Sequence, residues 1–272
     1  MSRLFNRLNG QRGTSLLEVM IALVITGIVT AAILKAYVSQ HKGYLIQEDV
    51  SDIQQNVRAS IDELVRHCRM AGYDIPLGLP AIITANTDPD TITLTYRTGN
   101  CDTYLSSAMP QPSAELKCGT DVSCFYDGQW VYIFEPDSGI GEWFEITHVQ
   151  ADAKHIQHNT MVLSRKYGAD ALLLAMTQIK FFVDTTDSDH PNMMIQMAGQ
   201  TPQVYAENIS DLQFQYRMKN DQIVDETLLP GDIREVLISV SGRSREPDPD
   251  LDENPYRERT FATSVFLRNV GI

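Results

Sequence analysis

The sequence is short of basic residues. It has 22 Lys and Arg against 35 Asp and Glu in 272 residues, a formal net charge of −13. A protein that binds a nucleic-acid backbone needs a basic surface, so this balance argues against nucleic acid as a partner. Hydrophobic residues make up 43% of the chain and charged residues 21%, a composition that excludes a disordered or fibrous protein.

The sequence also lacks the motifs of common catalytic sites. There is no HExxH zinc motif, no GxSxG nucleophile motif and no GxxxxGK[ST] phosphate loop. The six histidines show no metal-ligand spacing: His41, His67, His148, His155, His158 and His190. We therefore predict no catalytic residues, no cofactor and no enzymatic activity.

Near the N-terminus the sequence lacks residues that would interrupt an apolar helix. No proline occurs before Pro76, and no charged residue lies between Val19 and Leu34. The apolar run from Leu16 to Leu34 would form a helix roughly 28 Å long at ~1.5 Å per residue, close to the ~30 Å hydrocarbon core of a bilayer. Because three basic residues precede the run, the short N-terminal side is predicted to stay cytoplasmic. These basic residues are Arg3, Arg7 and Arg12.

Two general interpretations of this segment leave one residue unexplained. A secretory signal peptide needs a small-x-small cleavage site after its apolar core, but the sequence 30–32 (Thr-Ala-Ala) lies inside the run. A plain signal anchor fits the length and the charge. Neither accounts for Glu18, since a carboxylate at the edge of a membrane helix is costly unless it has a partner.

Glu18 follows Gly13 by five residues, and Gly13 ends the basic leader, residues 1–13. A basic leader, a glycine, a spaced glutamate and an uninterrupted apolar helix together resemble the class III signal of type IV pilins and type II secretion pseudopilins. The resemblance implies cleavage between Gly13 and Thr14 by a membrane-embedded prepilin peptidase, followed by N-methylation of Thr14, where the family commonly has Phe. It also implies that Glu18 neutralises the new α-amino group of a neighbouring subunit.

After Lys35 the apolar residues fall on one face at helical spacing. They are Ile46, Val50, Ile53, Val57, Ile61, Leu64 and Cys68. Gly72 and Pro76 end the pattern. The sequence predicts a helix from about Ser15 to Ala71, within a helical region 14–72. Residues 14–35 would lie in a membrane or a filament core, and the later part would pack on a globular head.

From residue 73 onward the sequence alternates as in β-strands separated by turns. The predicted strands are Ala81–Ala85, Thr91–Tyr96, Trp130–Glu135, Trp143–Val149, Met161–Ser164, Leu174–Val183, Met193–Met197, Asp211–Met218, Arg234–Ser241 and Thr260–Arg268. We expect an α+β fold in which the long helix packs on an antiparallel head, residues 73–272.

The last two predicted strands extend the resemblance. A strand, an acidic loop and a final strand ending in Leu-Arg-Asn, residues 234–269, are similar to the C-terminus of PilW-type minor pilins and GspJ-type pseudopilins. The resemblance implies a minor pilin in the inner membrane with its head in the periplasm, and later in the pilus. The implied partners are other minor pilins, the major pilin, the prepilin peptidase and the assembly platform. The alternatives are a GspJ-like pseudopilin and a signal-anchored periplasmic enzyme or binding protein.

The four cysteines lie in the part predicted to be extracytoplasmic, where disulfides form. They are Cys68, Cys101, Cys118 and Cys124. Of the three pairings that four cysteines allow, we predict a local Cys118–Cys124 bond and a Cys68–Cys101 bond that ties the loop to the helix. The alternative for Cys68 is a free thiol, because it lies on the apolar face of the helix.

Two acidic clusters are calcium candidates. The first contains Asp184, Asp187 and Asp189, and the second contains Asp248, Asp250, Asp252 and Glu253. The second begins like an EF-hand loop, but Glu253 replaces the required glycine and Arg259 stands where the bidentate glutamate should be. We therefore favour a solvated acidic loop over a metal site.

Overall fold

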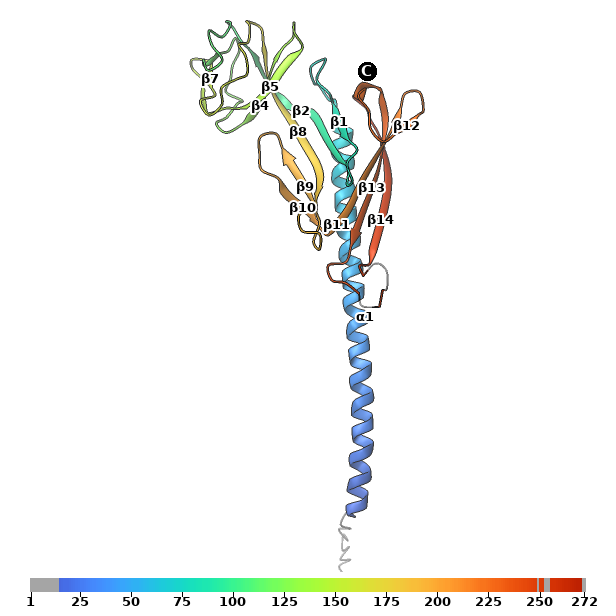
Figure 1. Ribbon diagram of the computed structural model, residues 1–272. Coiled ribbons are helices and arrows are strands. Elements are labelled where there is room, and N and C mark those ends of the chain that lie inside the picture. Colours follow the sequence, from blue (N-terminus) through green and yellow to red (C-terminus); the bar gives the residue numbers. More distant parts are fainter. Residues whose placement is uncertain (1–14, 249, 252–254, 271–272) are drawn as a thin grey trace, which may run out of the picture. The chain divides into compact units, whose positions relative to one another are not determined.

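The computed structural model describes residues 15–248, 250–251 and 255–270 (Figure 1). The chain divides into two compact units, with the boundary between Val50 and Ser51. The predicted leader and Thr14 lie outside the described residues.

A single 55-residue helix, α1 (Leu16–Met70), opens the described chain, against a prediction of Ser15 to Ala71. Ser15 caps its N-terminus. The Ser15 hydroxyl accepts a hydrogen bond from the Leu17 N–H at 3.3 Å, and the Ser15 carbonyl accepts one from the Glu18 N–H at 3.0 Å. The helix stays continuous through two glycines at positions 27 and 43. After its end, Gly72 takes a positive φ of 81°, the left-handed conformation that stops helices.

The second unit contains three antiparallel sheets within the described residues (Figure 1). The seven-stranded sheet has β1 (Ile82–Ala85), β2 (Thr91–Tyr104), β8 (Leu172–Asp184), β4 (Trp130–Glu135) and β5 (Ile140–Glu145) in that order, with β9 (Asn192–Met197) beside β8 and β10 (Gln203–Glu207) beside β9. The four-stranded sheet has β12 (Ile223–Val224), β11 (Ile209–Met218), β13 (Ile233–Arg243) and β14 (Glu258–Phe266) in that order, and a 3₁₀ turn, η1 (Pro230–Asp232), precedes β13. The small sheet has β3 (Leu116–Lys117), β7 (His155–Gln157) and β6 (His148–Gln150).

The main core of the second unit joins the later part of α1 to both large sheets. Leu64 from α1, Phe181 from β8, Phe214 from β11 and Val240 from β13 are each 0–1% exposed and belong to one apolar cluster. Each such side chain contributes roughly 1.5–3 kcal/mol when it is fully buried. A second apolar cluster is formed by residues from Leu105 to Ala175, most of which lie between β2 and β8 in the sequence. The predicted fold class, one long N-terminal helix with an antiparallel β head, is confirmed.

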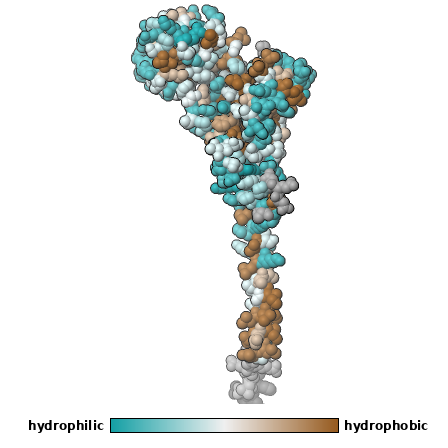
Figure 2. All heavy atoms as spheres, in the orientation of Figure 1, coloured by the Kyte–Doolittle hydropathy of each residue, from teal (hydrophilic) through white to brown (hydrophobic). Residues whose placement is uncertain are grey.

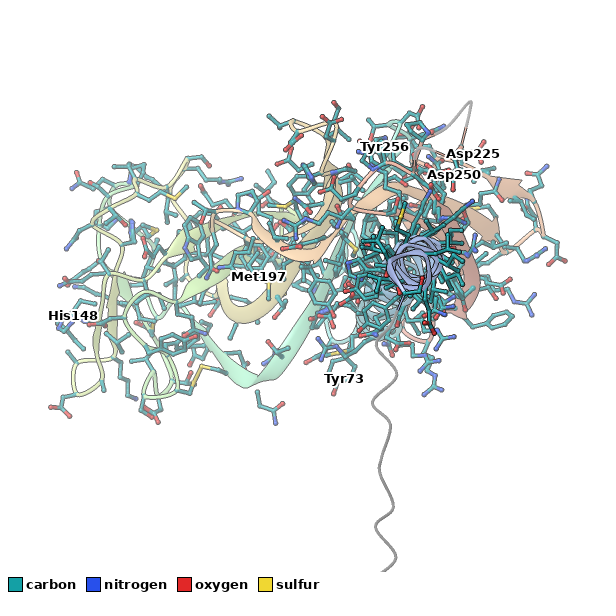
Figure 3. The ribbon with its side chains drawn as sticks, turned by 90° about the horizontal axis from the view of Figure 1, so that it is seen from below. Tyr73, His148, Met197, Asp225, Asp250 and Tyr256 are labelled. Atoms are coloured by element: carbon teal, nitrogen blue, oxygen red, sulfur yellow. A yellow bond between two sulfur atoms is a disulfide. The ribbon has the colours of Figure 1, made fainter. Side chains whose placement is uncertain are left out.

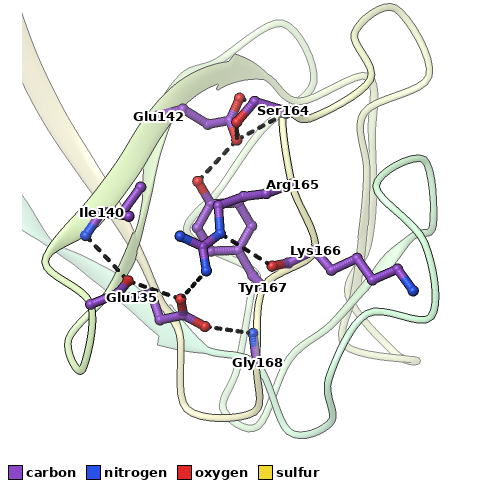
Figure 4. A network of polar contacts seen from close by, with 9 residues as sticks. Glu135, Ile140, Glu142, Ser164, Arg165, Lys166, Tyr167 and Gly168 are labelled. Carbon is purple, nitrogen blue, oxygen red and sulfur yellow. Dashed lines mark hydrogen bonds and ion pairs between the residues drawn. The ribbon is translucent and has the colours of Figure 1, made fainter.

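The predicted strand Met161–Ser164 is wrong, because this segment is held by side chains instead of a β-ladder (Figure 4). The Ser164 N–H donates to the Glu142 carboxylate at 2.9 Å, and the Tyr167 hydroxyl donates to the same carboxylate at 2.9 Å. A second carboxylate, Glu135, accepts hydrogen bonds from Arg165 and from a backbone N–H. The backbone hydrogen bond from Gly168, with one from a serine hydroxyl, lowers the pKa of Glu135.

Other strand predictions differ in their bounds. The predicted strand Trp143–Val149 is divided between β5 and β6. The sequence analysis missed β3, β7, β10 and β12, which have two to five residues each. Strands this short carry too few alternating positions to register as a pattern.

The predicted cysteine pairing is also wrong. The disulfide joins Cys101 to Cys124, whose Cα atoms are 5.8 Å apart, and Cys68 and Cys118 are free and buried. Cys68 is fully buried in the main core and Cys118 is 6% exposed in the second core, so each faces apolar side chains. Burial raises the pKa of the Cys68 thiol to about 12 and that of Cys118 to about 11. The prediction paired Cys118 with Cys124 because the two are close in sequence, but Cys118 faces the core.

The calcium candidates form no cluster among the described residues. Asp248 is 6% exposed, and its carboxylate accepts a hydrogen bond from the Arg257 guanidinium at 2.8 Å. Asp184 accepts hydrogen bonds from Thr186, two residues further along the chain. Asp252 and Glu253 lie outside the described residues. The carboxylates of Asp184 and Asp248 therefore have partners within the protein.

A buried polar chain links α1 to β2 in the main core. His67 is 6% exposed; its Nε2 is 2.9 Å from the Glu63 carboxylate and its Nδ1 is 2.7 Å from the Tyr96 hydroxyl. In the neutral ring Nε2 donates to Glu63, so Nδ1 accepts from Tyr96. Burial lowers the pKa of His67, against the opposing effect of Glu63, and burial raises the pKa of Tyr96 to about 12. The charge of Arg66 on the same helix also lowers the pKa of His67, and Phe181 packs against the ring.

Because His67 is buried, we expect the protein to lose folding stability in mild acid. The pKa of His67 is lower in the folded chain than its ordinary 6.5, so the unfolded chain binds more protons as the pH falls below 6.5. The contribution of His67 to the free energy of unfolding is therefore fully present above pH 6.5 and declines below it. We expect the unfolding temperature of the full chain in detergent to fall between pH 7 and pH 5. His67→Gln should cost about 1–2 kcal/mol at pH 7 and flatten this dependence. Equal pH slopes in the two proteins would contradict the assignment.

Candidate assembly surface

The N-terminal part of α1 exposes apolar side chains on every face, one of which is visible in Figure 2. Leu16 is 80% exposed, Leu23 is 70% exposed and Ile33 is 62% exposed. The helix is long and apolar enough to cross a membrane. In its most apolar stretch of 18 residues, none is buried within the structure. An exposed apolar surface of this extent marks a membrane or protein interface, because water would disfavour it.

One acid interrupts this surface. Glu18 is the single charged residue between Ser15 and Leu34 and lies in the first turn of the helix. The partial positive charge at the N-terminus of the helix favours a negative charge there. Ser15 and Glu18 also stand at the first and fourth positions of a capping box, in which serine caps the helix and an acid follows three residues later. The sequence analysis missed the Ser15 cap, although the S-x-x-E spacing could have shown it.

Small residues form part of the same surface. Ala22, Thr26 and Thr30 follow one another at four-residue spacing and lie beside Gly27 and Ala31 in a shallow groove on the helix. Small side chains at this spacing let another helix approach closely in an apolar environment. The Thr26 hydroxyl donates to the Ala22 carbonyl at 2.7 Å, so it needs no partner outside its own helix. The surface therefore suits contact with lipid or with other apolar helices.

Comparison with known proteins identifies the N-terminal segment. A family model described as the prokaryotic N-terminal methylation motif matches residues 8–34. No curated protein matches the chain. Among solved structures, a type IV-like pilin from Thermus thermophilus is similar at 8% identity, with a TM-score of 0.39, over 80% of this chain and 97% of that one.

The chain thus carries the N-terminal methylation motif of prokaryotic prepilin-type proteins on a fold with one long apolar N-terminal helix and an antiparallel β head. The matched segment includes Gly13, Thr14 and Glu18. The structure describes Glu18 and not the two residues of the predicted cleavage site. Cleavage and methylation therefore remain predictions.

Proposed function

We propose that the protein is a minor pilin of the type IV pilus that takes part in priming filament assembly. The observation that supports this most is the methylation motif at residues 8–34, which leads directly into an apolar helix with a single acid near its start. A filament subunit needs a helix that is stable in the membrane before assembly and inside a helical core after it. An apolar surface without buried contacts of its own meets both conditions.

The proposed chemistry begins with cleavage between Gly13 and Thr14 by a prepilin peptidase. Cleavage removes the basic leader and leaves a charged α-amino group next to the apolar helix. In an apolar helix bundle such a charge persists only if an opposite charge pairs with it. Glu18 of an adjacent subunit supplies that charge, and the pairing fixes the axial offset between the two helices. The same peptidase would N-methylate Thr14.

The large size of the second unit favours a specialised minor subunit over the major subunit that repeats along the filament. In this proposal the head lies in the periplasm while the helix remains in the inner membrane. The chain then associates with other minor pilins and with the major pilin, and the assembly platform moves the complex outward to the tip of the pilus. The protein itself catalyses no reaction; its work is specific association in support of pilus biogenesis, adhesion and twitching motility.

The mature N-terminus tests the proposal most directly. We expect mass spectrometry of the protein from its native membrane to show a chain that begins at Thr14 and carries one N-methyl group. Deletion of the prepilin peptidase should restore the full-length chain. A mature chain that begins at Met1, or after the small residues near position 32, would instead support a signal-anchored or secreted protein.

The phenotype of a gene deletion distinguishes a subunit of the pilus from a subunit of the related secretion system. We expect deletion of the gene to remove surface pili and twitching while type II secretion of exoproteins continues. Loss of secretion with normal pili would assign the chain to the pseudopilins, in which the cleavage and the role of Glu18 are the same.

A further inference from the structure

The seven-stranded sheet has a gap along one edge of β8. On this edge, β4 pairs with residues 172–174 and β9 pairs with residues 179–184, while β2 occupies the opposite edge. Residues 175–178 therefore have no strand partner on this edge among the described residues. The N–H of Ala198, just after β9, closes one end of the gap by donating to the Gln178 carbonyl at 3.0 Å. The result is a cleft of about 410 Å³ in the second unit.

Both tryptophans of the chain, Trp130 and Trp143, line this cleft. Each is half-buried and contributes to the lining of the cleft. The ring of Trp130 lies on Gly199, which has a positive φ of 68° and where an added Cβ would come within 2.0 Å of the ring. Trp143 packs on Tyr132 with 5.3 Å between the ring centroids. The two rings are therefore held in place before any ligand arrives.

A third aromatic ring stands at the rim. Tyr126 is 64% exposed and follows Cys124 by two residues. The disulfide from Cys124 to Cys101 anchors this loop to β2, and both cysteines line the cleft. The Gln129 side-chain oxygen accepts a hydrogen bond from the Tyr126 N–H at 3.2 Å, which fixes the loop further. The disulfide thus positions an exposed aromatic ring beside the two tryptophans.

The polar lining of the cleft is neutral. None of its lining residues is charged, although the chain has a net charge of −13. Amide groups come from Gln129, Gln178 and Gln200, and a pair of hydroxyls from Thr98 and Thr177, 3.0 Å apart. The Gln129 oxygen is used by the backbone, so its amide N–H₂ remains as a donor. Within the described part of the chain, neither tryptophan donates its indole N–H to a protein acceptor.

We propose that this cleft binds a neutral saccharide. A sugar ring has an apolar face of C–H groups that packs on an aromatic ring, and a rim of hydroxyls that pair with amides, indole N–H groups and other hydroxyls. Fixed aromatic rings with a few convergent neutral polar groups match both parts of such a ligand, and the volume lies in the ~300–1,000 Å³ range of small-molecule sites. An anionic ligand would find no cation in the lining and an acidic chain around it.

The two tryptophans give a direct readout, because no tryptophan lies elsewhere in the chain. The full chain is purified in a phosphocholine detergent, whose headgroup contains no sugar, and titrated with methyl β-glucoside, methyl β-galactoside, N-acetylglucosamine, cellobiose and lactose. We expect a saturable change in tryptophan emission with at least one of them, with a Kd on the order of 1 mM for a small open cleft. Flat titrations with all five would overturn the proposal.

A matched pair of exposed tyrosines locates the site. Tyr126 is 64% exposed and lines the cleft, whereas Tyr73, which follows the end of α1 and is not among the residues that line the cleft, is 54% exposed (Figure 3). Neither change removes a buried side chain, so both variants should fold. We expect Tyr126→Ala to raise the Kd at least ~fivefold and Tyr73→Ala to leave it unchanged. Gln200→Ala, also at an exposed position, should raise it by a smaller factor. Equal affinities in the two tyrosine variants would overturn the assignment, as would binding of glucuronic acid as tight as that of the neutral sugars.

Discussion

Glu18→Ala is expected to remove the protein from assembled filaments while leaving cleavage after Gly13 intact. In the proposed filament, the loss of this carboxylate leaves the α-amino group of a neighbouring subunit without a counter-charge in apolar surroundings. An unpaired buried charge costs several kcal/mol, and ~1.4 kcal/mol corresponds to a tenfold change in an equilibrium. Incorporation should therefore fall at least ~tenfold. The measurement is the amount of this chain in sheared pili, relative to its amount in the membrane.

Two further variants separate charge from helix capping. Glu18→Gln keeps the size of the side chain and the glutamine accepted at the fourth position of a capping box, but removes the charge. We expect it to fail like Glu18→Ala. Glu48→Ala removes an exposed acid from a later part of the same helix and should leave incorporation unchanged. Normal incorporation of Glu18→Gln would show that Glu18 acts through the helix end and not through a charge pair.

The helix could be predicted from sequence because its determinants are local. The absence of proline before Pro76 and the absence of charge from Val19 to Leu34 allow one long apolar helix. The later spacing of apolar residues, of which Val57 and Leu64 are fully buried, marked the face that joins the main core. Helical period and helix stops depend on neighbours in the chain, so a single sequence suffices to place them.

The disulfide and the cleft could not be predicted, because they depend on which strands pair. Cys101 meets Cys124 since β2 and the segment before β4 are brought together across a 23-residue separation. The cleft exists because β4 and β9 reach the same edge of β8 from its two ends and stop at different residues. Trp130 begins an apolar run at residues 130–134 and Trp143 precedes Phe144, as core aromatics do, and nothing local marked them as half-buried. Pairing of distant strands is a global property that local spacing does not encode.

The helix meets the four-stranded sheet at a glycine, and filling that position should be costly. A Cβ built at Gly242 of β13 would come within 2.7 Å of the Val57 Cγ2 and 3.2 Å of the Ile53 Cγ2, both on α1 in the second unit. Elsewhere in a strand, alanine would be favoured over glycine by roughly 0.5–1 kcal/mol. Here the β-branched Val57 has one strongly preferred rotamer in a helix and cannot turn away. We expect Gly242→Ala to destabilise the chain by about 1–3 kcal/mol, the usual cost of overpacking, measured by urea unfolding in detergent.

A second glycine and a double variant show whether this close contact is the cause. An added Cβ at Gly231 would meet nothing within 4 Å, so Gly231→Ala should change stability by less than ~0.5 kcal/mol. Val57→Ala alone leaves a cavity in the main core and should destabilise the chain. In the double variant, the methyl group added at position 242 occupies space that the valine side chain has vacated, so the combined loss should be smaller than the two single losses together by about 1 kcal/mol. Additive losses would mean that the contact with Val57 is not the cause, because removing the valine side chain would then not relieve the strain.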